Sequence, residues 1–358
     1  MKMKKLLACA MAGMVTLGIA FTETSAATRD EIAAIKVSKS GKFNYWSADS
    51  EVKNKLVDYM KDITNKNSKN FIPVEDRIAV FDTDGTVLCE TAPYYFEWML
   101  YLDRALYDEN YKPTQEEKDY AKLIEEGIRV TKKFPPQVDV GEAAAQDKVF
   151  VGMTEEQYKD YLQKFMDKPV EGLTNLKWGE SFYLPMVEVI RYLQSNDFTV
   201  YIVSGSDREA VRILACDPLK LKSDNIIGSD INILAAGQGD KDGLNYVYKK
   251  DDYLVRGELT QKTLKMNKVL MISREIGKQP VLAFGNSSGD SSMLNYAING
   301  NKYKALSFML LCDDLERELG NEKKAENCKK LADENGWISV SMKNDFKTIY
   351  GDNVKREQ

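Results

Sequence analysis

The distribution of apolar residues predicts strands and helices in alternation before residue 90 and after residue 184. Short apolar runs that contain β-branched or aromatic residues predict buried strands at 78–81, 198–203 and 281–284. Apolar residues three or four positions apart predict helices at 51–63 and 184–194. The first of these helices has an apolar stripe made of Val52, Leu56, Tyr59 and Ile63. Further strands are expected after residue 304, with a polar helix between them.

Between residues 91 and 184 the pattern is almost wholly helical, with helical segments at 94–108, 116–130 and 154–168. A long helical insertion directly after a strand can close over the end of that strand and exclude water. It can also pack as an additional bundle on the sheet, and amphipathic spacing fits both alternatives. The expected division of the chain is a signal peptide at 1–27, a core at 28–90 and 185–358 that includes an N-terminal extension, and a helical cap at 91–184.

The first 27 residues have the composition of a signal peptide. Lysines precede the apolar run Leu6–Phe21, and small residues follow it, which is compatible with cleavage after Ala26 or Ala27. The run is shorter than the ~20 residues that a membrane span needs, which favours removal over a retained anchor. Lipidation at Cys9 is less favoured, because few apolar residues precede it. We therefore expect an exported protein, extracellular or periplasmic, with no stable membrane insertion after cleavage.

Composition excludes several kinds of site. The chain has no histidine, so histidine-containing catalytic triads, histidine phosphatases and histidine-ligated zinc sites are excluded. The formal charge of the chain is −5, and residues 1–26 carry three lysines and one glutamate, so their removal changes the charge by −2 to −7. An acidic chain without a basic run argues against nucleic acid as a partner.

Four cysteines remain after the expected cleavage, and none of them belongs to a CxxC pair. A zinc ribbon and a thioredoxin-type redox site are therefore not indicated. Cys312 and Cys328 bracket one short segment, and they are either a disulfide of an exported protein or two buried thiols. Cys89 is expected to pack in the core.

Two carboxylates follow the first predicted strand. Asp82 and Asp84 come directly after 78–81, and Gly85 allows the backbone to turn sharply there. Because buried strands of α/β sheets present their chemistry at their carboxyl ends, both carboxylates can reach one site. Such a pair suits a nucleophile, a proton shuttle and a cation, although an acidic turn is also found after many core strands.

Two later strands end in further polar loops. Ser204 and Gly205 follow 198–203, where a hydroxyl and backbone N–H groups can bind a phosphoryl oxygen, unless the segment is an ordinary turn. Arg208 either reaches the same phosphate or lies on the surface. The loop GNSSGD follows 281–284 and contains Asn286 and Asp290. The excursion at 225–260 contains a glycine-rich segment, GQGDKDG, whose spacing fits neither a dinucleotide fingerprint nor a calcium loop, so we expect a solvated turn there.

The segment DTDGT at 82–86 resembles the signature DxDGT of the haloacid dehalogenase superfamily of phosphohydrolases at every position. The serine at 204, a lysine before the last acidic loop and the loop itself resemble the other three motifs of that superfamily, in the same order. The resemblance implies an α/β fold, with a doubly wound, mostly parallel sheet and an inserted helical cap. The chain departs from the pattern at Asn286, where members commonly carry an acid.

The resemblance also implies a role for each candidate residue. Asp82 is expected to be the nucleophile and Asp84 the general acid and base, and Lys268 is preferred over Lys262 and Lys265 as the catalytic lysine. The implied phosphate-binding residues are Thr86, Ser204 and Gly205. The implied ligands of Mg²⁺ are Asp82, Asp84 through its backbone carbonyl, Asn286 and Asp290. The neutral amide of Asn286 would supply less charge to the cation than an acid.

The function that the resemblance implies is Mg²⁺-dependent hydrolysis of small phosphomonoesters through an aspartyl-phosphate. An acid at Asp84 favours phosphate chemistry over dehalogenation, which needs no proton donor at that position. Exported phosphoserine and phosphorylcholine phosphatases are the members that the chain resembles most. A pyrophosphatase, a phosphotransferase and a catalytically silent protein that binds a phosphorylated ligand are the alternatives. The aromatic cluster Tyr94, Tyr95, Phe96 and Trp98 fits either a site for a quaternary ammonium group or the core of the cap.

Overall fold

The computed structural model describes residues 26–89, 96–131, 141, 144–146 and 148–357. Its centre is a seven-stranded sheet with the strand order β4-β3-β2-β1-β5-β6-β7. All neighbouring strands are parallel except β3 and β4, which are antiparallel. The strands are β1 (Ile78–Phe81), β2 (Thr199–Asp207), β3 (Ile226–Ala235), β4 (Leu254–Gln261), β5 (Leu282–Gly285), β6 (Leu306–Leu311) and β7 (Ile338–Ser341). The mostly parallel sheet that the sequence predicts is therefore present.

The strand predictions differ most from the structure at β2. Strand β1 has the predicted bounds, and all four of its residues are buried, as expected for a central parallel strand. Strand β2 continues to Asp207, four residues beyond the prediction, because β3 still pairs with it at Ser229. The pairing of β2 with β3 changes register between Val203 and Asp207. The segment 204–206, which the sequence predicts as a turn, is thus a bulged part of the strand.

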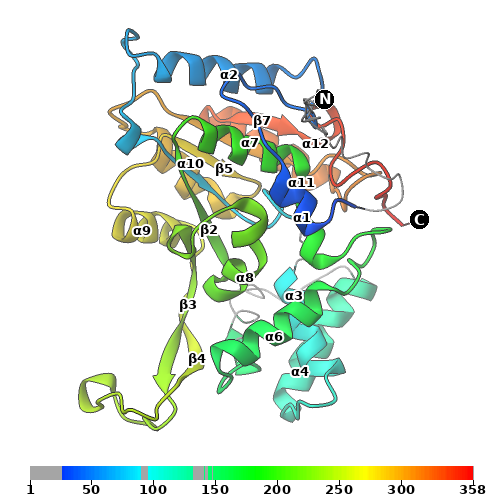
Figure 1. Ribbon diagram of the computed structural model, residues 1–358. Helices are drawn as coiled ribbons and strands as arrows, with labels where there is room; N and C mark the ends of the chain where they lie inside the picture. Colours follow the sequence, from blue (N-terminus) through cyan, green and yellow to red (C-terminus); the bar gives the residue numbers. More distant parts are fainter. Residues whose placement is uncertain (1–25, 90–95, 132–140, 142–143, 147, 358) are drawn as a thin grey trace, which may run out of the picture.

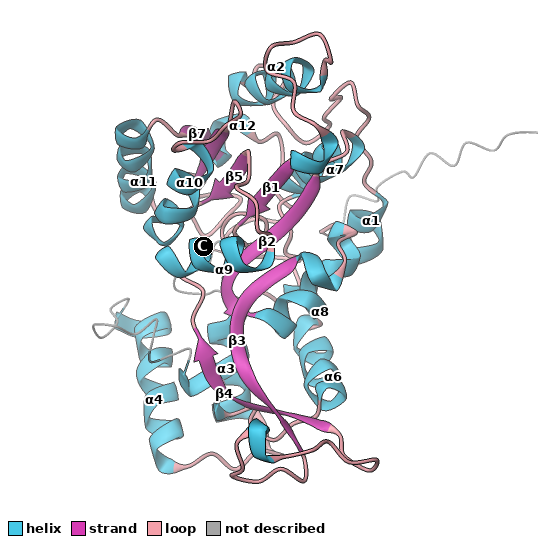
Figure 2. Cartoon of the chain, turned by 90° about the vertical axis from the view of Figure 1, so that its left-hand side faces the viewer, coloured by secondary structure: helices cyan, strands magenta, loops and turns pink. Residues whose placement is uncertain are grey.

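Helices cover both faces of the sheet, which makes the fold doubly wound (Figure 2). Buried side chains of β1, β2 and β3 pack on one face against three helices and on the other face against three more. The first three are α9 (Met266–Glu275), α10 (Ser291–Ile298) and α11 (Glu322–Asn335). The other face carries α7 (Leu184–Ser195), α8 (Arg208–Leu219) and α2 (Glu51–Thr64). A short helix, α12 (Met342–Asp345), follows β7.

A half-buried arginine attaches the N-terminal extension to the core, next to a proline in α8. Pro218 lies inside α8 and has no N–H group for the carbonyl of Leu214, four residues earlier. Arg29, in α1 (Arg29–Ala34), donates instead to Leu214 O at 2.8 Å and to Gly179 O at 2.9 Å. The extension therefore connects α8 to the last part of the insertion, just before α7. The predicted apolar stripe of α2 is mostly buried, since Leu56, Tyr59 and Ile63 belong to the core.

The insertion between β1 and α7 is helical, as its pattern predicts. Its described helices are α3 (Phe96–Leu102), α4 (Gln115–Glu126) and α6 (Glu155–Met166). π-helical turns follow α3 and α4 at Asp103–Tyr107 and Gly127–Thr131. The three helices lie together at one end of the sheet, beside the arm that β3 and β4 form (Figures 1 and 2). The backbone of Arg256 in β4 joins the two parts, because it accepts from Gly152 N at 2.8 Å and donates to Met153 O at 2.9 Å.

The arm agrees with the hairpin-like excursion predicted at 225–260. Its loop at 237–243 is almost entirely exposed, as a solvated turn should be. None of the helices in the described ranges has the length and apolar character that a membrane span requires. The signal peptide is predicted at 1–27, and its residues 1–25 lie outside the described ranges.

Candidate functional site

The carboxyl ends of β1, β2 and β5 meet at the candidate site. Asp82 directly follows β1, and its N–H group donates to Phe284 O in β5 at 2.9 Å. The chain then turns at Gly85, whose φ of 72° lies in the left-handed region that favours glycine. The Gly85 N–H group closes the turn by donating to Leu88 O at 2.9 Å. Asp82 and Asp84 are thereby held at the same edge of the sheet.

Lys268 in α9 is a buried cation between two carboxylates. Its side chain has no exposed surface, and its Nζ lies 2.5 Å from Asp82 Oδ1 and 2.7 Å from Asp290 Oδ1. It also donates to Val203 O at 2.7 Å, at the predicted end of β2. Among the contacts of the described residues, Lys268 is the one of the three candidate lysines that reaches Asp82. An ammonium group in this position favours the ionised form of Asp82.

Asp290 is surrounded by donors on both of its carboxylate oxygens. Oδ1 accepts from Lys268, and Oδ2 accepts from the backbone of Asn286 at 3.0 Å and from the backbone and hydroxyl of Ser287 at 3.1 and 3.2 Å. A Cβ atom at Gly285 would lie 2.5 Å from the Cβ of Asp290, so glycine is required for this approach. These contacts make Asp290 an acceptor that orients Lys268 and the loop, and its role as a metal ligand stays a prediction.

Several oxygen atoms at the site have the character that Mg²⁺ prefers. Thr86 Oγ1 lies 3.4 Å from Asp82 Oδ2 and 3.5 Å from Asn286 Oδ1, so these three oxygens converge. The described residues contain no group of three or more Asp, Glu, Cys or His side chains that could hold a metal. Neutral oxygens must therefore complete the set. Mg²⁺ accepts carbonyl and amide oxygens as well as carboxylates, so Asp82, Asn286 and the carbonyl of Asp84 fit it.

The two aspartates have different acidities. Burial, together with the charges of Asp82 and Glu97, raises the pKa of Asp84 to about 8, although a hydrogen bond from Ser206 opposes this. Burial and the charge of Asp290 raise the pKa of Asp82 to about 6, and the opposing effect of Lys268 limits that rise. At neutral pH the pair therefore favours an ionised Asp82 beside a protonated Asp84. This is the distribution that a nucleophile and a general acid require.

Ser204 and Gly205 lie in the bulged end of β2. Ser204 is fully buried, and its Oγ accepts from the N–H group of Ser206 at 3.0 Å. A Cβ atom at Gly205 would lie 2.5 Å from Cδ2 of Leu264, so a side chain at this position would require Leu264 to move. The carbonyl of Gly205 accepts from the hydroxyl of Ser229 at 2.6 Å. The structure thus places both residues at the same edge of the sheet as Asp82.

Two residues of the site, Ser206 and Glu97, were not predicted as site residues from the sequence. Ser206 donates from Oγ to Asp84 Oδ2 at 2.8 Å. Glu97 of α3 is only 2% exposed and accepts from the N–H group of Asp207 at 2.5 Å. Glu97 is the one charged residue within the apolar helix FEWMLYL, and a lone carboxylate in such a helix was a signal that could have indicated it. Ser206 carries no comparable signal.

Several weaker expectations are decided by contacts. Phe96 and Trp98 are buried, and Phe96 packs edge-on against Phe165 at 5.3 Å between ring centres, so these two belong to the core. Tyr94 and Tyr95 lie outside the described residues. Arg208 forms ion pairs with Asp230 and Glu275, both at 2.6 Å, and is therefore a structural residue and not a phosphate ligand.

The four described cysteines form no disulfide. Cys312 donates to Asn321 O at 3.5 Å, and Cys328 donates to Asn286 O at 3.3 Å. Of the two alternatives for Cys312 and Cys328, the structure has buried thiols. Cys89 is buried as well, as expected.

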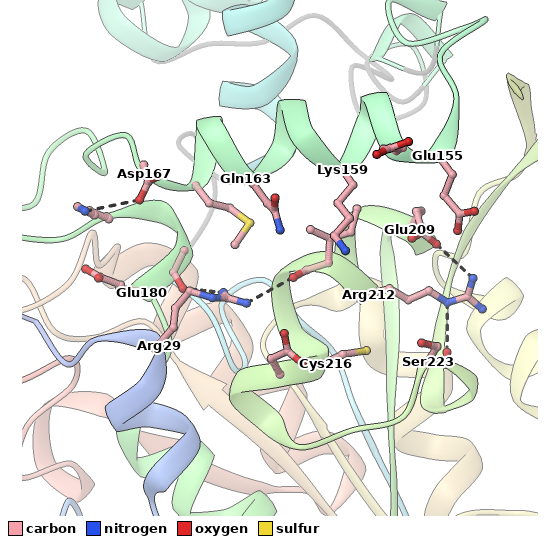
Figure 3. A pocket seen from close by; sticks show the side chains of 16 residues that line it. Arg29, Glu155, Lys159, Gln163, Asp167, Glu180, Glu209, Arg212, Cys216 and Ser223 are labelled. Atoms are coloured by element: carbon pink, nitrogen blue, oxygen red, sulfur yellow. Dashed lines mark hydrogen bonds and ion pairs between the residues drawn. The ribbon is translucent and has the colours of Figure 1, made fainter.

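A large open cleft, of about 690 Å³, lies away from this site, between α6 and α8 (Figure 3). Arg29, Lys159, Glu180, Glu209 and Arg212 line it, and none of the predicted catalytic residues does. Part of its charge is neutralised locally, for example by the ion pair of Arg212 with Glu209 at 3.3 Å. Exposed and partly paired charges of this kind lack the desolvation found around Asp82.

The fold and the site together define an α/β protein whose polar groups gather at the carboxyl ends of three parallel strands. The chain belongs to the haloacid dehalogenase-like hydrolases, because the sequence model of that family matches residues 79–295. The match begins inside β1 and ends in α10, and so includes every candidate site residue. No protein with curated annotation matches the sequence.

Solved structures with low sequence identity are similar to this chain over most of its length. A conserved, functionally unknown protein from Anaerococcus prevotii is 14% identical, with a TM-score of 0.52 over 88% of this chain and 98% of that one. Cytosolic 5'-nucleotidase IIIB bound to cytidine is 12% identical, with a TM-score of 0.46 over 82% and 85% of the two chains. A phosphoserine phosphohydrolase-like protein from Francisella tularensis is 14% identical, with a TM-score of 0.37 over 66% and 87%. At these identities, the first likeness supports the fold alone, and the other two are too distant to bear on function.

Proposed function

We propose that this hydrolase cleaves small phosphomonoesters and that Asp82 becomes phosphorylated during the reaction. The observation that carries the proposal is the pair of unlike aspartates: Asp82 beside the buried ammonium of Lys268, and Asp84 beside the hydroxyl of Ser206. One is suited to attack and the other to proton transfer. Membership of the hydrolase family supports the same reaction type.

In the first half of the reaction, a carboxylate oxygen of Asp82 attacks phosphorus and the bond from phosphorus to the ester oxygen breaks. The proton of Asp84 moves to the departing oxygen, so the product is a neutral alcohol. Lys268 offsets the negative charge around Asp82, and the hydroxyls of Thr86 and Ser204 are close enough to the nucleophile's loop to bind phosphoryl oxygens. When bound, Mg²⁺ would be held by Asp82, Asn286 and the carbonyl of Asp84, and would supply positive charge to the phosphoryl group.

In the second half, Asp84 is a carboxylate and removes a proton from water. The oxygen of that water attacks phosphorus, the bond between phosphorus and Asp82 breaks, and inorganic phosphate leaves. Both aspartates then return to their starting protonation states. The same acid therefore serves twice, first as a donor and then as an acceptor.

We also propose that the insertion at 91–184 acts as a cap over this site. The support is that Glu97 of α3 reaches Asp207 next to the site, and that Gly152 and Met153 bond to β4. A cap would exclude water and select the leaving group. For the location of the protein, the composition of residues 1–27 supports export, and the substrate is then a small phosphorylated molecule outside the cytoplasm.

The first test is release of inorganic phosphate from p-nitrophenyl phosphate, phosphorylcholine, phosphoserine and pyrophosphate, with Mg²⁺ and with EDTA. We expect release that depends on Mg²⁺ and is lost in Asp82→Asn, which keeps the size and the hydrogen-bonding shape of the residue. Unchanged circular dichroism of that variant is the control for folding. Release by Asp82→Asn at the rate of the unsubstituted protein would refute the role of Asp82.

The same panel separates the alternatives. Preference for pyrophosphate would indicate a pyrophosphatase, and transfer of phosphate to an added alcohol would indicate a phosphotransferase. Binding of a phosphorylated ligand without release in any condition would favour a silent binding protein. Asn286 is the observation that favours this last alternative, because it brings one fewer negative charge to the cation than an acid would.

A further inference from the structure

We propose that Ser206 is a positioning residue, which fixes the carboxyl group of Asp84 for proton transfer to the leaving group. We also propose that a buried network from the helical insertion holds Ser206 in place. The inference rests on the proposed function, because it requires Asp84 to protonate an ester oxygen.

The first step of the argument is the direct contact between Ser206 and Asp84. Ser206 Oγ donates to Asp84 Oδ2 at 2.8 Å, and Ser206 is 7% exposed. The backbone N–H group of Ser206 donates to Ser204 Oγ at 3.0 Å. The carbonyl oxygen of a protonated carboxyl group is its better acceptor, so a hydrogen bond to Oδ2 favours the proton on Oδ1. The contact therefore selects both the rotamer of Asp84 and the oxygen that carries the proton to be transferred.

The second step is the bulge in β2, which directs Ser206 toward Asp84. Along β2, residues 203 and 207 are four apart, whereas their partners in β3, Ile227 and Ser229, are two apart. The additional residues change the alternation of side chains between the two faces of the sheet. The hydroxyl of Ser229 stabilises the bulge through its bond to Gly205 O. A regular strand would not hold Ser206 in this orientation.

The third step is the network that fixes Asp207, the next residue in the chain. Its N–H group donates to Glu97 of α3, and its Oδ2 lies 2.8 Å from Nη2 of Arg256 in β4. Its Oδ1 accepts from Ala210 N at 2.8 Å, which caps α8. The guanidinium group of Arg256 stacks over the ring of Tyr158 in α6 at 3.6 Å.

The partners of Asp207 therefore come from α3, β4 and α8, and also from α6, because the hydroxyl of Tyr158 donates to Asp207 Oδ1 at 3.5 Å. Asp207 and Arg256 are 5% and 4% exposed, so solvent screens their ion pair little. A residue held from four elements cannot move without disturbing all of them. Because Ser206 is its neighbour in the chain, the backbone of Ser206 is held in place as well. The position of the general acid is in this way connected to the insertion.

The consequence depends on the leaving group. An alkoxide is a poor leaving group and needs the proton of Asp84, whereas p-nitrophenolate leaves readily without one. If Ser206 only aligns the acid, its loss should reduce cleavage of alkyl phosphates and spare p-nitrophenyl phosphate. A general structural role would reduce both reactions alike.

The experiment compares kcat/KM for glycerol 2-phosphate and for p-nitrophenyl phosphate in Ser206→Ala, Ser206→Thr and Asp84→Asn. This ratio reports the transfer of the phosphoryl group to Asp82 and not the later hydrolysis, in which Asp84 acts as a base for both esters. We expect Ser206→Ala to lose roughly ten- to a hundred-fold on the alkyl ester, part of the total effect of general acid catalysis, and at most about three-fold on the aryl ester. Ser206→Thr, which retains the hydroxyl, should recover most of the loss. Ser307→Ala is the matched control, because Ser307 is also buried and its hydroxyl donates to Leu294 O, far from Asp84.

The double variant Asp84→Asn with Ser206→Ala makes the test independent of any loss of stability. If Ser206 acts through Asp84, its removal should have no further effect on the alkyl ester once Asp84 is replaced. Equal losses on both esters, or additive effects in the double variant, would overturn the proposal. Failure of the proposed function would give a different result, since release by the unsubstituted protein would then be absent or would survive Asp82→Asn.

Discussion

The two sides of the site are built differently. Around Asp82, a fully buried lysine lies between two carboxylates, and every contact comes from the α/β core. Around Asp84, the contacts are a hydroxyl and a nearby carboxylate, and part of them depends on the insertion through Glu97 and Arg256. Ion pairs thus fix the side of Asp82, whereas hydrogen bonds and contacts with the insertion fix the side of Asp84.

This difference matches the two tasks that we propose. A nucleophile must remain ionised, and the ammonium of Lys268 supports that state at any position of the insertion. A proton donor must retain its proton and face the leaving group, and a neutral hydroxyl orients it without forcing it to ionise. Attachment to the insertion, which would cover the leaving group, then connects proton transfer to the substrate that is bound.

The largest effect is expected from Lys268→Ala, which removes the cation that distinguishes the side of Asp82 from the side of Asp84. Its removal leaves Asp82 and Asp290 as facing buried carboxylates without a cation, so we expect a loss of activity of about 10³-fold. The free energy of unfolding should fall by about 3–5 kcal/mol, the cost of breaking a buried pair. Phosphate release and urea unfolding measure the two effects.

The control for Lys268→Ala is Lys278→Ala. Lys278 pairs with Asp76 at 2.8 Å, but its side chain is 45% exposed. The expected loss of stability is therefore below about 1 kcal/mol. Equal losses in the two variants would show that burial does not distinguish the ion pair of Lys268.

An intermediate effect is expected from Arg256→Met, which tests the other side of the site. Methionine fills a similar volume but leaves Asp207 without its cation, so stability should fall by about 3 kcal/mol. The release of phosphate from an alkyl ester should fall about ten-fold, because the segment of Ser206 loses one of its supports. If activity is unchanged while stability falls, the network is structural and does not position Ser206.

The smallest of the expected effects is the change in kcat/KM when the pH is moved by about one unit from neutrality. Asp82 must be ionised, so activity should rise with pH, with a midpoint no higher than the pKa of about 6 that Asp82 has without a bound cation. Asp84 must be protonated, so activity should fall as pH rises through about 8. In Asp84→Asn the fall at high pH should disappear, and if it persists, another group is responsible for it. Bound Mg²⁺ would move the rise at Asp82 to lower pH, because positive charge favours the carboxylate.

Much of the fold and of the Asp82 side could be predicted from the sequence. The apolar runs at 78–81, 198–203 and 281–284 predict three of the strands, and Asp82, Ser204 and Asn286 each follow closely on one of them. Lys268 was selected among three lysines by its place in the order of motifs. The donors around Asp290 could not be predicted, because a sequence does not show which groups will surround an acid.

The Asp84 side was less accessible to prediction. The orientation of Ser206 depends on a bulge in β2, which follows from pairing with β3 and not from the local pattern. The pair of Asp207 and Arg256 joins residues 49 positions apart in different elements. Contacts of this kind are set by tertiary packing, and hydrophobic periodicity carries no information about them.

The measurement that tests the central claim most directly is detection of phosphate on Asp82. The enzyme is mixed with substrate and Mg²⁺, the reaction is stopped with acid within the first turnovers, and the peptide containing Asp82 is analysed by mass spectrometry. We predict a phosphorylated Asp82 that is absent from Asp82→Asn and decays as phosphate is released. Steady release of phosphate with no modification of that peptide at any time would contradict the account.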